Sequence, residues 1–135
     1  MGIAMQASLW VALGGALGSV GRYWTGLWFA RLAGEAFPWG TLFINVLGSF
    51  AIGLFASLMV GDGLMPASLN ARLFVMAGIC GGYTTFSAFS LQTLALARAG
   101  HSIWALAYVG GSVVLCLAGV TAGHLLASRF GLSAG

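Results

Sequence analysis

A polar run, Gly81-Gly82-Tyr83-Thr84-Thr85-Phe86-Ser87-Ala88-Phe89-Ser90, interrupts the third of four long apolar segments in this chain of 135 residues. Its glycines and paired threonines are weak helix formers, whereas the residues on either side are good ones. We therefore predict a helix that breaks near the middle of this segment. Backbone groups freed by a break inside a bilayer are costly unless protein, water or an ion satisfies them. A break in such a place usually lines a cavity.

The rest of the chain has the composition of a protein immersed in lipid. Hydrophobic residues make up 60% of it and charged residues 5%, and the mean hydropathy is +1.01. A soluble domain needs more polar surface than this. Stretches of about 20 apolar residues can cross the hydrocarbon core of a bilayer. Four charge-free stretches of that kind occur, at residues 1–21, 36–61, 73–97 and 99–128.

These stretches predict an all-α membrane protein with four transmembrane helices, the third broken near its centre, in a single domain over residues 1–135. Turn residues between the stretches place the helix ends. We expect the helices over roughly Gln6–Arg31, Trp39–Val60, Ser68–Ala99 and Ser102–Ser128. Pro38 suits the start of the second helix, and Gly61-Asp62-Gly63 is expected to end it.

Small residues recur at four-residue spacing in the first and last helices, at Gly14, Gly18, Gly26, Gly119 and Gly123. Such faces allow helices to approach closely in lipid. They predict packing faces, and they make an oligomer a reasonable expectation.

The arginines are balanced between the two ends of the predicted bundle. Arg72 and Arg129 lie at one end, and Arg31 and Arg98 lie at the other. The positive-inside rule therefore selects no orientation, as in a protein that inserts both ways up. We expect antiparallel dimerisation as a hypothesis.

Polar side chains on three helices are candidates for lining a pore. Thr84, Ser87 and Ser90 recur every third residue beside Phe86 and Phe89, and further stripes are formed by Thr41, Asn45 and Ser49 and by His101, Tyr108, Ser112 and Cys116. The Asn45 amide either joins two helices or lines the pore. All of these groups are neutral donors or aromatic rings with electropositive edges, which suits a small anion or a polar solute. Arg22, near a membrane face, is expected to raise the anion concentration at an opening.

Catalytic chemistry and nucleic-acid binding have no support in the sequence. Glu35 and Asp62 both fall in connections, and His124 lies alone toward a helix end. No set of nucleophile, base and orienting group is present, and no cluster of metal ligands or phosphate loop is found. The few arginines are dispersed and form no basic patch. The sequence therefore indicates a protein that is not an enzyme and that binds no nucleic acid.

Three motifs of the chain resemble those of the Fluc (CrcB) family of fluoride channels. They are Gly21-Arg22-Tyr23, Pro38-Trp39-Gly40-Thr41-Leu42 with Asn45 and Gly48, and the polar run of the third helix. The resemblance implies an antiparallel, dual-topology homodimer in the inner membrane of a bacterium. It implies two pores through which fluoride leaves the cell passively, so that cytoplasmic fluoride falls.

The resemblance also assigns roles to single residues. It implies a structural Na⁺ at the centre of the dimer, held by the backbone carbonyls of Gly81 and Thr84. The predicted fluoride pathway comprises Asn45, Phe86, Phe89, Thr41, Ser87, Ser90, Tyr108, Ser112 and Arg22. The chain departs from the family at Cys116, where a hydroxyl is common, and at Tyr83, where an apolar residue is expected. A thiol is a weaker donor than a hydroxyl.

Two rival functions belong to other classes. A small four-helix multidrug exporter also has dual topology, but it requires a Glu within the membrane, and the four stretches contain none. A non-conducting assembly subunit would use the broken helix only for packing. Fluoride flux from liposomes separates these possibilities.

Overall fold

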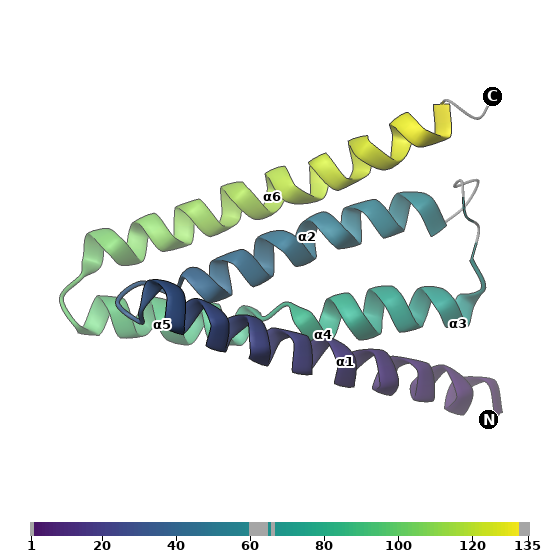
Figure 1. The fold of residues 1–135 in the computed structure, drawn as a ribbon, viewed down its shortest axis with the longest axis horizontal. Helices are drawn as coiled ribbons and strands as arrows, with labels where there is room; N and C mark the ends of the chain where they lie inside the picture. The colour runs from purple at the N-terminus through teal and green to yellow at the C-terminus, as the bar shows by residue number, and fades with distance from the viewer. Residues whose placement is uncertain (1, 60–64, 66, 133–135) are drawn as a thin grey trace.

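The computed structural model describes residues 2–59, 65 and 67–132, and within these ranges the chain forms helices and connections without a strand. The elements are α1 (Gly2–Ala33), α2 (Trp39–Met59), α3 (Leu69–Arg72), η1 (Leu73–Cys80), α4 (Gly81–Tyr83), α5 (Phe86–Arg98) and α6 (Ser102–Leu132). The elements from α3 to α5 follow one another along a single axis and form one interrupted span (Figure 1). Four spans are thus long and apolar enough to cross a membrane. The predicted all-α class with a broken third helix is confirmed.

Most of the predicted helix ends agree with the structure, and the first and last helices contain the exceptions. The first helix begins four residues before Gln6 and continues past Arg31 to Ala33, and the last helix continues past Ser128 to Leu132. Gly34, with a φ of 73°, follows the end of the first helix, and Gly100, with a φ of 82°, follows the end of the third span. At Gly100 the amides of Gly100 and His101 donate to the carbonyls of Ala97 and Leu96, which closes the helix as a Schellman motif. The predicted second helix end at Val60 and Gly61-Asp62-Gly63 lies outside the described residues.

The break in the third span lies at two threonines and not at the glycines that precede them. Gly81 is helical, with φ −65° and ψ −36°. Thr84 and Thr85 are extended, with φ and ψ of −77° and 158° and of −153° and 113°. The break thus lies within the predicted polar run, at its paired threonines, whereas its glycines remain helical. The helix continues through these glycines, with π-type hydrogen bonding in η1, and stops only after Tyr83.

The glycines before the break serve the contact between α1 and the third span. A Cβ at Gly78 would lie 2.8 Å from the Gly14 Cα, and a Cβ at Gly82 would lie 2.6 Å from the Gly15 carbonyl oxygen. A Cβ at Gly18 would collide with the Ile79 carbonyl oxygen. Close backbone approach is the reason for glycine at such positions in membrane helices. The predicted small-residue face of α1 is thus a packing face within one chain.

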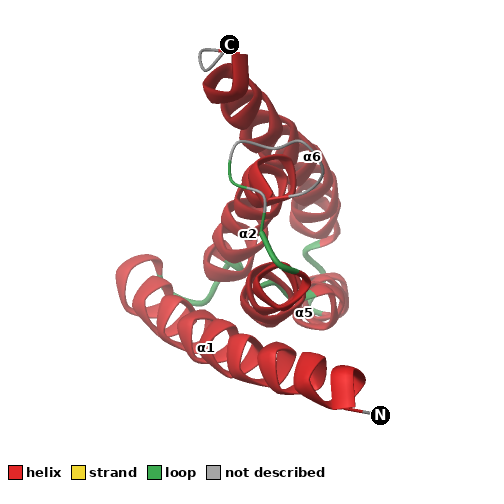
Figure 2. Cartoon of the chain, turned by 90° about the vertical axis from the view of Figure 1, so that its right-hand side faces the viewer, coloured by secondary structure: helices red, strands yellow, loops and turns green. Residues whose placement is uncertain are grey.

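The second pair of helices, α2 and α6, packs by the same principle. A Cβ at Gly119 would lie 3.0 Å from the Val46 carbonyl oxygen, and one at Gly123 would collide with that of Phe50. Figure 2 shows α2 and α6 side by side, while α1 crosses on the opposite side of the third span. Gly26 is different, because a Cβ there would meet nothing within 4 Å. Of the five glycines predicted to form packing faces, four therefore lie at close helix contacts within the chain, and Gly26 does not.

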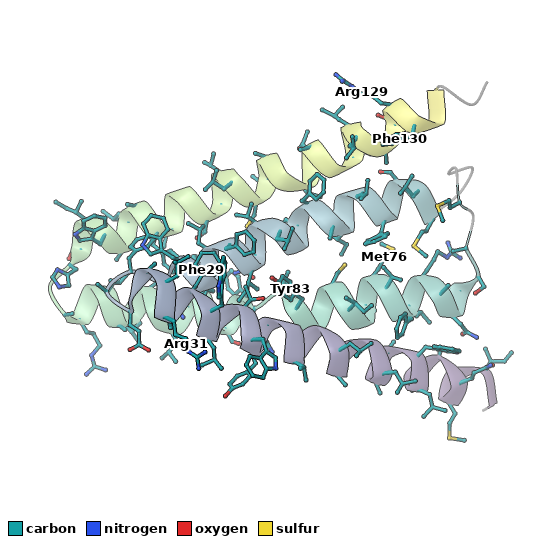
Figure 3. The ribbon with its side chains drawn as sticks, viewed as in Figure 1. Phe29, Arg31, Met76, Tyr83, Arg129 and Phe130 are labelled. Carbon is teal, nitrogen blue, oxygen red and sulfur yellow. The ribbon has the colours of Figure 1, made fainter. Side chains whose placement is uncertain are left out.

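Both ends of the described chain lie at the same end of the bundle, as an even number of spans requires (Figure 1). Arg31 and Arg129 lie toward opposite ends of the bundle (Figure 3). Large apolar side chains cover the outer surface, including Leu13, Leu106 and Leu117, which are all more than half exposed. Such a surface suits contact with lipid or with another apolar surface.

Candidate functional site

The Asn45 side chain of α2 holds the backbone at the break. Its Oδ1 accepts from the Thr85 amide at 2.8 Å, and its Nδ2 donates to the Thr85 carbonyl at 3.1 Å. In an uninterrupted helix the Thr85 amide would donate to the Gly81 carbonyl. The amide side chain therefore satisfies both backbone groups of Thr85, and the Gly81 carbonyl loses its regular α-helical partner. Asn45 joins two helices, as one of our two interpretations expected.

Thr85 also begins the half-helix that follows. Its Oγ1 accepts from the Ala88 amide at 3.2 Å and lies 3.2 Å from the Ser87 hydroxyl. Threonine is a good N-cap residue because its oxygen satisfies an amide of the first turn. The positive end of the α5 dipole thus lies at the break. The sequence argument did not single out Thr85, although a Thr directly before a helical pattern is a recognised start signal.

The Arg22 guanidinium of α1 lies at the break. Its Nη1 donates to the Thr84 carbonyl at 3.3 Å, and the side chain is half-buried. The α1 helix continues for 11 residues beyond Arg22, and the expected effect of Arg22 on the anion concentration at an opening stays a prediction. Arg22 supplies a hydrogen bond to a carbonyl that the break has freed.

Tyr83 attaches α4 to α1. Its hydroxyl lies 3.2 Å from the Thr25 Oγ1, and the Thr25 hydroxyl donates to the Gly21 carbonyl at 2.8 Å. Because a hydroxyl carries one proton, Tyr83 is the donor in this pair. Figure 3 shows Tyr83 at the level of the break. The hydroxyl that departs from the family pattern thus points toward α1.

A cavity of about 340 Å³, which we call the break cavity, lies beside these residues. Its wall consists of Asn45, Gly48, Ser49, Ile52, Cys80, Gly81, Thr84, Thr85, Phe86, Phe89, Ser112, Val113 and Cys116. The wall contains no charged side chain. Ser112 is 6% exposed, and its hydroxyl has no hydrogen-bond partner among the described residues. Since buried polar groups are normally paired, this unpaired hydroxyl is a candidate hydrogen-bond donor at the cavity.

A second cavity, of about 420 Å³, adjoins the connection between α1 and α2, and we call it the connection cavity. Thr41, Glu35 and Gln92 are among its lining residues. Tyr108 lies between the two cavities, because its ring is 5.1 Å from that of Phe89 and its hydroxyl donates to the Gln92 Oε1 at 3.0 Å. Tyr108 is 1% exposed, and the Thr41 side chain lies against it. Predicted pathway residues therefore lie on both sides of this tyrosine.

Gln92 was missed by the sequence argument. It is the only Gln in the third span, and the reasoning that singled out Asn45 in the second helix applies to it equally. Its Oε1 is occupied by Tyr108, so its amide nitrogen remains available as a donor at the connection cavity.

The phenylalanines form an aromatic row along the break cavity. The rings of Phe86 and Phe89 are 5.3 Å apart and inclined by 45°. Phe86 is 78% exposed, whereas Phe89 is half-buried against Tyr108. Ser87 and Ser90 are exposed and line neither cavity, and the Ser90 hydroxyl donates to the Phe86 carbonyl at 2.9 Å. A single chain therefore assembles only part of the predicted pathway.

The groups at the break that could bind a metal ion are uncharged. Gly81 and Thr84 both line the break cavity, and the Thr84 carbonyl accepts from Arg22. Among the described residues, no group of three His, Cys, Asp or Glu side chains could hold a metal ion. A metal at the break would therefore have at most two such side chains as ligands, beside backbone carbonyls.

These features define a small multi-pass membrane protein whose discontinuous third helix lines an uncharged, mainly apolar cavity that contains a few polar groups. A family model described as CrcB-like protein, Camphor Resistance (CrcB), matches residues 9–124. The chain belongs to this family. The family that the motifs predicted is thus confirmed, and with it the prediction that the protein is not an enzyme.

Several curated relatives resemble the chain over nearly its whole length. A protein of Rhodospirillum rubrum is 56% identical over 117 residues, which cover 87% of this chain and 91% of the relative. A protein of Opitutus terrae is 54% identical over 123 residues, covering 91% and 93%. One of Methylocella silvestris is 51% identical over 119 residues, covering 88% and 91%. All three are named fluoride-specific ion channel FluC.

Proposed function

We propose that the protein is a fluoride-selective channel through which fluoride leaves the cell passively, so that cytoplasmic fluoride falls. The observation that carries the proposal is the break cavity, where the partnerless Ser112 hydroxyl faces a wall without charged side chains. The names of the relatives support fluoride as the anion.

The cavity wall suits a small anion that must bind and leave quickly. Hydroxyl and amide groups and the positive end of the α5 dipole stabilise negative charge without a full opposite charge. Ring edges of Phe86 and Phe89 are electropositive and extend this environment. A full positive charge on the wall would hold the anion too tightly for conduction. Arg22 donates to a backbone carbonyl and is not among the lining residues.

The proposed assembly is an antiparallel homodimer with dual topology and two pores, each built from both chains. Support comes from the pathway residues that one chain leaves exposed, namely Phe86, Ser87 and Ser90. The balanced arginines at the two ends of the bundle support insertion in both orientations. We place the dimer in the inner membrane of a bacterium.

A structural Na⁺ at the dimer centre is part of the proposal. The carbonyls of Gly81 and Thr84 would hold it, since neutral oxygens suit a hard cation. The break has removed the regular helical partner of Gly81, and Thr84 shares its oxygen with Arg22. A high-resolution map of the protein in Na⁺ should show density at short distances from both oxygens, and a clear map without such density would exclude this ion.

Fluoride efflux from liposomes tests the proposed function. Purified protein in liposomes loaded with fluoride should release it when the membrane potential is clamped, and liposomes loaded with chloride should retain their chloride. Replacing Phe86 or Phe89 with Ile should sharply reduce fluoride efflux while the dimer remains intact. Equal efflux of both anions, or no efflux, would contradict the proposal. No described residue supplies the intramembrane Glu that a multidrug exporter needs, because Glu35 lies between α1 and α2.

A further inference from the structure

The break cavity contains two cysteines that the proposed fluoride pathway does not use. Cys80 ends η1 and is 4% exposed, and Cys116 lies on α6 and is half-buried. Both are free thiols, and both line the same cavity from different helices. Two thiols on the wall of one cavity form a set of soft donors.

The remaining wall offers no charged side chain that would attract a hard divalent cation to these thiols. It contains no carboxylate and no imidazole. Ser112 lies one helical turn before Cys116, and its hydroxyl is free to donate. A hydroxyl beside a metal-bound thiolate stabilises the charge of that sulfur, as outer groups do in known metal sites. The cavity therefore favours a thiophilic ion over Mg²⁺ or Ca²⁺.

We propose that the break cavity is a binding site for a soft metal ion such as Hg²⁺, with Cys80 and Cys116 as its two ligands, and that the bound ion blocks the pathway. On binding, two S–H bonds break and two S–Hg bonds form. Both protons leave to water, and no electron is transferred. The blocking part of this inference rests on the proposed function, whereas the binding part does not.

Binding is tested on the purified full chain with mercuric chloride as the probe. Native mass spectrometry should find one mercury per chain, with the loss of two protons, in the presence of a monothiol competitor. Changing Cys80→Ser or Cys116→Ser should each weaken retention by at least about tenfold, because even the loss of an outer group at a metal site costs that much. The proposed site would be overturned if the parent protein retained no mercury, or if either variant retained mercury as well as the parent protein does.

Folding of the variants is checked by circular dichroism and by the elution volume of the purified protein. Should Cys80→Ser unfold, Cys80→Ala provides the same test with a residue that keeps the site apolar. Mg²⁺ is the matched metal control and should not be retained.

Blocking is tested by fluoride efflux before and after mercury, with each protein compared with its own initial rate. Efflux of the parent protein should stop and should return when a dithiol removes the metal, whereas Cys116→Ser should be insensitive. Mercury that binds without changing measurable efflux would overturn the blocking role. In a further outcome, the parent protein binds mercury but shows no fluoride efflux before mercury is added. That result would contradict the proposed function and the blocking role, while the metal site itself would stand.

Discussion

Asn45 is the side chain on which the geometry of the break depends. Changing Asn45→Ala would leave the amide and the carbonyl of Thr85 without partners. Each buried group left unpaired costs about 1–3 kcal/mol, so we expect the midpoint of thermal unfolding in detergent to fall clearly. Thr121→Ala is the matched control, because Thr121 is exposed and bonds only to the Leu117 carbonyl of its own helix. Equal effects of the two substitutions would contradict this role of Asn45.

Ser112 allows function to be separated from stability. Changing Ser112→Ala removes a buried hydroxyl without a described partner, so unfolding should be unaffected or slightly more difficult. Fluoride efflux should fall by about tenfold, since one hydrogen bond to an anion contributes about 1.5 kcal/mol or more. Ser128→Ala, at an outward-facing position near the end of α6, should leave efflux unchanged. A Ser112→Ala protein with normal efflux would remove this hydroxyl from the pathway.

Single residues could be predicted from the sequence where an unusual side chain stands alone in an apolar helix. Asn45 was found in this way, whereas Ser112 was found as one member of a polar stripe, and both line the break cavity. Thr85 and Gln92 were missed: Thr85 is one of several hydroxyl residues in a polar run, and Gln92 follows that run by only two residues. Their partners, Asn45 and Tyr108, come from other helices. Only the tertiary structure reveals such pairs.

At the scale of the elements, the contact between α1 and the third span depends on individual glycines. Changing Gly14→Ala would bring a Cβ to 2.9 Å from the Gly78 Cα, and overpacking of this kind costs about 1–3 kcal/mol. Gly15→Ala is the matched control, because its Cβ would meet nothing within 4 Å. That change should stabilise the helix slightly, since Ala is the better helix former. Thermal unfolding measures the stability of both variants. Similar unfolding midpoints for Gly14→Ala and Gly15→Ala would contradict the close contact at Gly14.

The link between α4 and α1 can be tested with one oxygen atom. Changing Tyr83→Phe removes the hydroxyl that donates to Thr25 and should destabilise the protein by about 0.5–1.5 kcal/mol. Tyr23→Phe is the control, because Tyr23 is 63% exposed on the same helix as Thr25. Parallel unfolding measurements should show a lower stability for Tyr83→Phe than for Tyr23→Phe. A loss of stability in Tyr23→Phe alone would contradict the structure.

The break could be predicted within the polar run, but not which of its weak helix formers would end the helix. Helix propensity favours the glycines over the threonines, because glycine is the weakest helix former after proline. In the structure those glycines remain helical and make room for α1. A sequence does not tell whether a glycine is present for flexibility or for a close contact. The two threonines break the helix because Asn45, Arg22 and Thr85 itself satisfy the backbone groups that this frees.

For the whole molecule, the arginine balance predicts how the chain enters the membrane. Removing Arg31 and Arg98, which are both exposed at one end of the bundle, should give a single orientation, because the remaining positive charge then favours the other end. A reporter fused to the C-terminus should report both orientations for the parent protein and one for this variant. If the working dimer is antiparallel, this variant should show no fluoride efflux when it is produced without an oppositely oriented partner.

Coexpression provides the control for this experiment. A second variant without Arg72 and Arg129 should have the opposite orientation, and producing both variants in one cell should restore efflux. Efflux from either variant alone would contradict the antiparallel assembly.

The number of spans could be predicted from composition, but their pairing could not. Every span is apolar on most of its surface, so no apolar face distinguishes a helix contact from a lipid contact. The pairing of α2 with α6 depends instead on Gly53, Gly119 and Gly123, whose backbone atoms meet those of the partner helix. In a water-soluble protein, an amphipathic pattern would have identified the faces that pack together. In lipid, where both kinds of face are apolar, only the close fit of the two helix surfaces distinguishes them.

The length of α1 makes the protein sensitive to the thickness of its membrane. Its 32 residues extend over about 48 Å at the α-helical rise, whereas the hydrocarbon core measures about 30 Å. The 21 residues of α2 fit that core almost without excess. Hydrophobic mismatch must therefore be absorbed by tilt of α1 or by its ends. Because α1 contacts the broken span backbone to backbone, a change in its tilt in thinner or thicker lipid is transmitted directly to the break. Acyl-chain length is thus a physical variable to which this site should respond.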